Sequence, residues 1–131
     1  MFPRVRDTDP CPCGSGGTYD GCCAPAHRGE PATTPEALMR SRYAAFVVGD
    51  AAYLRETWHP GTRPETIDPD AAVRWRGLEI VDVERGGPGD RRGVVEFRAR
   101  WREAGRDGEL HERSRFVRQS DRWWYLDGEV R

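Results

Sequence analysis

A chain of 131 residues suffices for one domain of ordinary size with a small appendage, but not for two large domains. Its formal net charge of −1 gives no general attraction to polyanions, so composition predicts no specific nucleic-acid binding. No segment has the length and apolarity of a membrane span, and the first residues lack the apolar stretch of a signal peptide. We therefore expect a cytoplasmic protein whose cysteines stay reduced.

The four cysteines of the chain all lie between residues 11 and 23. They are Cys11, Cys13, Cys22 and Cys23. Four thiolates form the ligand set of a closed, tetrahedral structural zinc site. The glycines at positions 14, 16 and 17 permit the sharp turn that a one-residue ligand spacing demands, because glycine readily adopts positive φ. The cluster therefore predicts a zinc knuckle, which with its linker occupies residues 1–30.

Other uses of the cysteines stay open at this point. Two disulfides would need bridges between adjacent or one-apart cysteines, or crossing bridges in a very short loop, which fit the preferred Cα separations poorly. One thiol could instead serve redox or nucleophilic chemistry. An iron–sulfur site also uses four cysteines, but with other spacings. His27 in the linker is either a substitute zinc ligand or a solvated side chain.

Two helices are predicted after the linker. The first should begin after Thr34, an N-cap residue followed by proline, and stop at Gly49. Asp50 can cap a second, shorter helix that ends at His59. The proline-rich stretch 60–72 is expected to be a loop.

From Val73 onward the apolar period changes from 3.6 to 2, which predicts strands. The expected strands cover about residues 73–83, 95–102, 110–118 and 123–127. Gly77 predicts a bulge in the first strand, and the Asp-Gly pair at 107–108 predicts a hairpin turn. Two helices before an antiparallel meander of about four strands predict an α+β fold. Residues 31–131 would form a roll, with the helices on one face of a curved sheet.

The cysteine cluster and the roll each resemble known protein modules. Residues 11–23 resemble the SEC-C motif, the zinc-binding tail of the SecA translocase ATPase. With that motif, the chain is similar to the YchJ family over residues 36–46, 53–54, 57–60, 112–116 and 124–128. Members of this family join a SEC-C motif to a nuclear-transport-factor-2-like domain. The resemblance implies that fold for the roll and, because the SecA tail docks on partner proteins, an interaction module at the knuckle.

Roll domains of this kind often open a pocket between the first helix and the concave face of the sheet. Glu112 shares a strand face with Phe116 and should point inward, where a carboxylate must be paired or neutral. One interpretation makes His59 and Glu112 an acid–base pair. Its pocket would be lined by Arg42, Tyr43, Trp58 and Trp124. The preferred interpretation is a structural ion pair, in which Glu112 holds Arg42 or Arg98 under an aromatic lid.

The opposite face of the sheet is expected to carry a stripe of basic side chains. Its members are His111, Arg113 and Arg115, beside Arg98 and Arg100 of the neighbouring strand. The stripe offers contacts for an acidic partner or for phosphates. The expected arrangement is nevertheless a solvated face whose charges compensate one another.

No phosphate-binding loop, Gly-x-Ser-x-Gly elbow or His-Glu-x-x-His signature occurs. We therefore expect a non-enzymatic binding or adaptor protein, whose knuckle docks on a protein or ribonucleoprotein partner. The roll would bind a second partner or a small ligand. The alternative is a small hydrolase, isomerase or dehydratase of the roll class that uses His59 and Glu112. A homodimer formed through exposed sheet faces is also compatible with the sequence.

Overall fold

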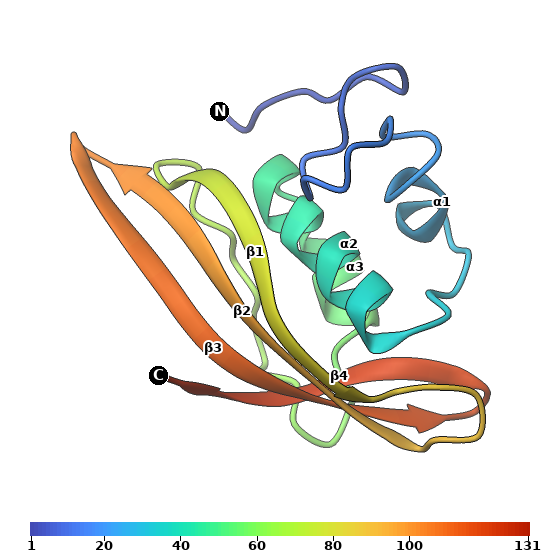
Figure 1. Ribbon diagram of the computed structural model, residues 1–131. Coiled ribbons are helices and arrows are strands. Elements are labelled where there is room, and N and C mark those ends of the chain that lie inside the picture. Colours follow the sequence, from blue (N-terminus) through green and yellow to red (C-terminus); the bar gives the residue numbers. More distant parts are fainter.

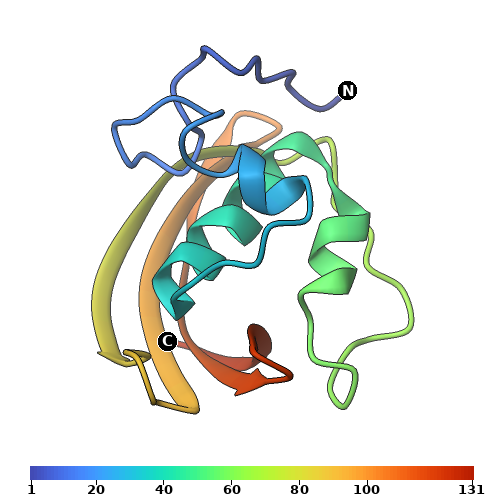
Figure 2. The same ribbon diagram turned by 90° about the vertical axis from the view of Figure 1, so that its right-hand side faces the viewer.

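The computed structural model describes residues 1–131 and contains three helices followed by four strands. The helices are α1 (Ala24–His27), α2 (Pro35–Val48) and α3 (Ala51–Glu56). The strands are β1 (Arg74–Arg85), β2 (Arg92–Glu103), β3 (Arg106–Gln119) and β4 (Arg122–Val130). They form one antiparallel sheet in the order β1-β2-β3-β4, which curves around α2 (Figures 1 and 2). The predicted α+β roll is confirmed.

The ends of α2 and α3 follow from local capping. The side chain of Thr34 accepts a hydrogen bond from the backbone N–H of Ala37 at 3.1 Å, and Gly49 ends α2 with a φ of 76°. Asp50 caps α3 by accepting from the N–H of Tyr53 at 3.0 Å. Both helix starts agree with the sequence prediction. The second helix is shorter than expected, and it ends at Glu56 rather than near His59.

The predicted Asp-Gly hairpin turn is wrong. The β2–β3 turn uses Ala104 and Gly105, whose φ angles are 50° and 78°, and Gly108 lies inside β3 opposite Trp101. A Cβ atom on Gly108 would come within 2.1 Å of the Trp101 indole, so glycine serves packing here. The bulge expected near Gly77 is confirmed by a shift in the pairing of β1 with β2, and a second shift follows Ile80.

The core lies between α2 and the concave face of the sheet. Its largest members include Leu38 and Met39 of α2 with Val95, Phe97 and Phe116 of the sheet. Burial of each such side chain contributes about 1.5–3 kcal/mol to folding. Three of the four cysteines belong to the same buried cluster, and Figure 1 shows the N-terminal segment lying against α2. The knuckle and the roll therefore share one core. None of the helices combines the length and the apolarity needed to cross a membrane.

Candidate metal centre

The loop that carries the first two cysteines is closed by its own backbone. The N–H of Cys11 donates to the carbonyl oxygen of Gly17 at 2.9 Å, and the N–H of Gly14 donates to that of Cys11 at 3.1 Å. Gly14 and Gly16 have φ angles of 76° and 93°, where a residue with a side chain would be strained. These contacts produce the tight turn that brings Cys11 and Cys13 to the same side of the loop.

The other two cysteines lie at the start of α1. The backbone N–H groups of Cys22 and Ala24 both donate to the carbonyl oxygen of Tyr19, at 3.1 and 3.0 Å. Cys23 is the N-cap residue of α1. This short turn directs both sulfur atoms toward the first loop.

The four sulfur atoms converge, and all lie within 4.8 Å of one another. The Sγ atom of Cys22 is 3.5 Å from that of Cys13 and 3.9 Å from that of Cys23. In a tetrahedral zinc site with Zn–S bonds of about 2.3 Å, neighbouring sulfurs stand about 3.8 Å apart. All four cysteines are free rather than joined in disulfides. Their arrangement fits a single tetrahedral metal ion.

The electrostatics of the cluster favour a cation at its centre. A hydrogen bond from Cys23, with contributions from Ser15 and Cys22, lowers the pKa of Cys13 to about 4. The same contact raises the pKa of Cys23, and burial raises the pKa of Cys11 to about 11. The thiolate of Cys13 thus favours the protonated form of Cys23, and burial favours that of Cys11, because negative charge in this space is unfavourable. A divalent cation would allow all four sulfurs to ionise.

Helix α2 holds the knuckle in place through Arg40. The guanidinium donates from Nη1 to the carbonyl oxygen of Cys13 at 3.0 Å and from Nε to Glu36 Oε2 at 3.0 Å. Glu36 lies one turn earlier on the same helix, so it orients Arg40 toward the loop. A ligand residue is thereby tied to the scaffold through its own backbone.

His27 is neither a metal ligand nor a solvated side chain, so both sequence interpretations of it are wrong. Its Nδ1 lies 2.6 Å from the hydroxyl of Tyr19, and its Nε2 lies 2.8 Å from the carbonyl oxygen of Ser41 in α2. The Nε2–H must donate to that carbonyl, which leaves Nδ1 to accept from Tyr19 in the neutral ring. The ring also packs edge-on against Tyr53 at 4.7 Å. His27 therefore bridges the knuckle to both longer helices, a role that spacing alone did not indicate.

Inside the roll, Arg42 is buried and lies between two aromatic rings. Its guanidinium carbon is 4.4 Å from the ring centroid of Tyr125 and 5.2 Å from that of Trp58. Nη1 donates to the carbonyl oxygen of Leu54 at 2.8 Å and to Thr57 Oγ1 at 2.7 Å. Burial lowers the pKa of Arg42 to about 10, so the group stays charged at neutral pH. The expected aromatic lid is present, but no carboxylate contacts Arg42 directly.

Glu112 does point to the concave side, yet its partners are not those expected. Its Oε2 accepts hydrogen bonds from Ser114 Oγ at 2.6 Å and from the Tyr125 hydroxyl at 3.2 Å. Tyr125 thus stands between Glu112 and Arg42, so the predicted direct ion pair is wrong. Arg98 instead contacts Glu79 and Glu109 on the other face of the sheet.

The structure does not bring His59 and Glu112 together. His59 Nε2 is 2.8 Å from the side-chain oxygen of Gln119, at the far end of β3. Seven residues of strand, about 23 Å, separate Gln119 from Glu112. The residues that were expected to line one pocket lie in different places as well. Tyr43 packs against Trp75, while Trp124 lies on the outer face against His59, and only Trp58 contacts Arg42.

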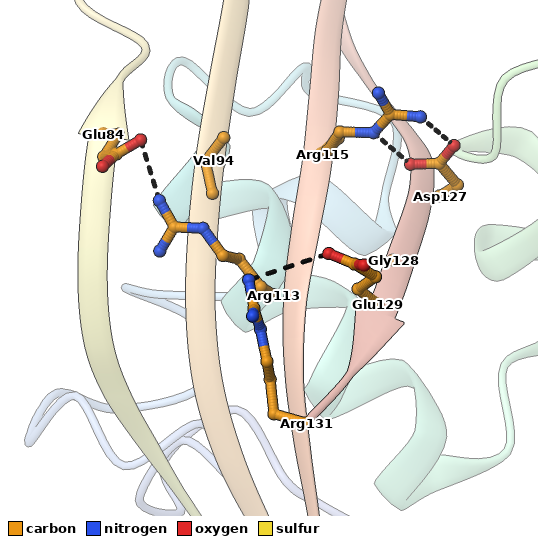
Figure 3. Close-up of a pocket in the computed structure, with 8 residues that line it drawn as sticks. All are labelled: Glu84, Val94, Arg113, Arg115, Asp127, Gly128, Glu129 and Arg131. Carbon is orange, nitrogen blue, oxygen red and sulfur yellow. Dashed lines mark hydrogen bonds and ion pairs between the residues drawn. The ribbon is translucent and has the colours of Figure 1, made fainter.

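The outer face of the sheet carries mostly compensated charges, as the preferred interpretation stated, but Arg100 of the predicted stripe forms no ion pair. Arg113 contacts Glu84 at 2.8 Å and both Asp82 and Glu96 at 3.0–3.1 Å. His111 Nε2 lies 2.7 Å from Glu96, and this contact lowers the pKa of Glu96. A groove of about 480 Å³ lies on this face. In Figure 3 each of its arginines points toward an acidic neighbour. Its other ion pairs are Arg115 with Asp127 and Arg131 with Glu129.

Comparison with known proteins agrees with this architecture. Residues 34–128 match the family model described as the middle nuclear-transport-factor-2-like domain of YchJ, and residues 8–25 match the SEC-C motif. The chain belongs to the YchJ family. A UPF0225 protein of Streptomyces coelicolor is 54% identical over 123 residues, which cover 93% of this chain and 96% of the relative. A UPF0225 protein of Deinococcus radiodurans is 52% identical over 122 residues, covering 90% and 87%.

Two solved structures share the fold of this YchJ-family chain. The solution structure of a SEC-C motif containing protein from Rhodopseudomonas palustris has a TM-score of 0.81 at 40% identity, covering 92% of this chain and 98% of that one. The crystal structure of a SEC-C motif containing protein from Psychrobacter arcticus has a TM-score of 0.77 at 29% identity, covering 95% and 84%. The resemblance inferred from the sequence is thereby confirmed, and the SEC-C match contains all four cysteines but not His27.

Proposed function

We propose that this YchJ-family chain is a non-enzymatic docking protein whose knuckle holds one structural Zn²⁺ through Cys11, Cys13, Cys22 and Cys23. The observation that carries the proposal is the convergence of four free sulfurs at tetrahedral spacing. Four protein ligands leave no open coordination position, so the metal would shape a surface rather than activate water. Four unpaired thiols also fit a reducing compartment, and the proposal includes the cytoplasm.

The two sides of the knuckle support a docking role. One side is fixed to α2 by Arg40 and His27, whereas residues 14–18 at the tip are exposed to solvent. Cys22 is half-exposed beside that tip, and Ser15 Oγ lies 3.1 Å from its sulfur. A rigid, exposed loop loses little entropy when a partner binds it. The proposed partner is a protein or a ribonucleoprotein. The enzymatic alternative receives no support, because His59 and Glu112 lie far apart.

Elemental analysis of protein purified without chelator tests the metal, and we expect about one zinc per chain. Asp20→Arg then tests the tip, because Asp20 is exposed beside it and is not a ligand. Asp68→Arg, in the exposed loop before β1, is the matched control. We expect Asp20→Arg to keep its zinc but to lose partners that wild type and Asp68→Arg capture from a bacterial lysate. Equal capture by all three proteins would remove the tip from the docking surface.

A further inference from the structure

Five arginines gather where the β1–β2 and β3–β4 turns lie side by side, at the lower right of Figure 1. They are Arg85, Arg91, Arg92, Arg118 and Arg122, here called the arginine end. No carboxylate lies within ion-pair distance of any of them. The nearby acids include Asp90, which accepts from the N–H of Gly87, and Asp121. Glu84 lines a hollow with Arg85 and Arg92 but pairs with Arg113, and Glu30 and Glu56 line a hollow with Arg122. The five guanidinium groups of the arginine end thus form no ion pairs, although acidic side chains lie in their neighbourhood.

The opposite end of the sheet contains both paired and unpaired arginines. There Arg102 contacts Asp107 at 2.9 Å, and Arg98 contacts Glu79 and Glu109 at 3.8 and 4.0 Å. Carboxylates thus meet these two guanidinium groups, whereas Arg100 and Arg106 of the same end form no ion pair. At the arginine end the guanidinium groups keep their hydrogen-bond donors available to a ligand.

Aromatic rings border the arginine end on the outer face of the sheet. Trp124 is opposite Val117 in the strand register, and its indole N–H donates to the carbonyl oxygen of Gln119 at 3.0 Å. This bond fixes the plane of the ring. The guanidinium carbon of Arg122 lies 5.6 Å from the ring centroid, and His59 meets the ring edge-on at 6.0 Å. The half-buried indole is thereby held as a flat platform beside unpaired cations.

A polar hollow lies between the two turns. Its volume is about 490 Å³, and Arg91 and Arg118 contribute to its wall along with Gln119. The backbone N–H of Arg118 donates to the carbonyl oxygen of Arg91 at 2.9 Å, which keeps the two arginines adjacent. Asp90 and Asp121 line the same hollow, and Arg91 and Arg118 supply its guanidinium donors to the oxygens of a phosphate.

We propose that the arginine end binds a single-stranded nucleic acid, with backbone phosphates on the arginines and a base on Trp124. Unpaired arginines neutralise phosphates, and aromatic faces stack on bases that a duplex would hide. The Trp124 ring and the unpaired arginines occur together here. This combination favours a polynucleotide over an acidic protein surface, because nucleotide bases stack on an aromatic ring and carboxylates do not. None of these contacts uses a cysteine or the tip of the knuckle, so this proposal is tested independently of the docking role.

The test measures fluorescence anisotropy of a labelled 12-nucleotide oligouridylate with the intact, metal-loaded protein across a range of salt concentrations. The triple variant R91Q/R92Q/R122Q removes three exposed arginines from the arginine end, and R6Q/R102Q/R106Q removes three exposed arginines elsewhere. We expect the first to weaken binding about tenfold or more and to reduce the salt slope by about two, since each phosphate contact on a single strand contributes about 0.7. The control should stay within about twofold.

A second variant tests the base contact. W124L should weaken binding about fivefold or more without changing the salt slope, because stacking releases no counterions. Oligothymidylate of the same length should bind comparably, since nothing in the proposed contacts uses a 2′-hydroxyl. Thermal melting and zinc content of each variant confirm that folding is unchanged. The proposal is overturned by absence of binding at 50 mM salt, by equal weakening in both triple variants, by an unaffected W124L, or by polyglutamate competing as well as oligouridylate.

Discussion

The knuckle and the interior of the roll both remove polar groups from water, but they balance charge in opposite ways. In the knuckle four like groups converge, and the contact that lowers the pKa of Cys13 raises that of Cys23. In the roll the single charge of Arg42 meets two ring faces and two oxygen acceptors. The knuckle therefore needs a cation that the chain does not supply, whereas the contacts of Arg42 are all supplied by the roll itself. Convergence of polar side chains indicates a ligand site only where their charges remain unbalanced.

The largest effect should come from breaking the knuckle. Cys13→Ser removes a fully buried sulfur at the centre of the cluster. We expect loss of the bound metal and a fall of more than about 4 kcal/mol in the free energy of unfolding, because structural zinc contributes about 10–16 kcal/mol of apparent binding energy in small domains. Scanning calorimetry with and without chelator measures this change.

Ser15→Ala is the control for that experiment, because it changes the same loop without removing a ligand. Its metal content should match wild type, and chelator should lower the melting temperature of both proteins. If chelator left the wild-type melting temperature unchanged, the knuckle would be as self-sufficient as the roll interior, and the contrast between them would disappear.

The next effect should come from removing the charge inside the roll. Arg42→Met keeps most of the side-chain volume but loses two cation–π contacts and two hydrogen bonds. We expect the free energy of unfolding to fall by about 3 kcal/mol, because a desolvated cation–π contact contributes up to about 2 kcal/mol and a charged hydrogen bond about 1.5–3 kcal/mol. Urea denaturation measures the loss, and zinc content should be unchanged. Equal or higher stability would mean that the desolvation of Arg42 outweighs its contacts.

The sequence predicted those parts of the structure that local chemistry determines. Thr34, Gly49 and Asp50 carry strong capping signals, and the ends of α2 and the start of α3 match them. The cysteine cluster was predictable for the same reason, since its ligands are close in sequence. The hairpin at Asp107 was not, because the packing of Trp101 on Gly108 outweighs a local turn preference.

The parts that the sequence could not predict depend on contacts between distant segments. Whether Glu112 meets Arg42 or His59 depends on strand register and on where the loop after α3 crosses the sheet. The arginine end was hidden in the same way, because Arg91 and Arg118 come together only when two separate turns align. Net charge is a sum over the chain and carries no information about such clustering.

The smallest effect should come from the junction between the two regions. His27 and His59 each make two side-chain hydrogen bonds, His27 at the contact of the knuckle with α2 and His59 at the surface. We expect His27→Ala to lower the free energy of unfolding by about 2 kcal/mol, since each hydrogen bond contributes about 1 kcal/mol. His59→Ala should cost only about 0.5 kcal/mol, because water replaces its exposed contacts. Hydrogen exchange then locates the difference. Faster exchange at the knuckle amides of His27→Ala, with zinc retained, would show that metal and junction hold the knuckle separately, whereas simultaneous loss of zinc would make them one unit.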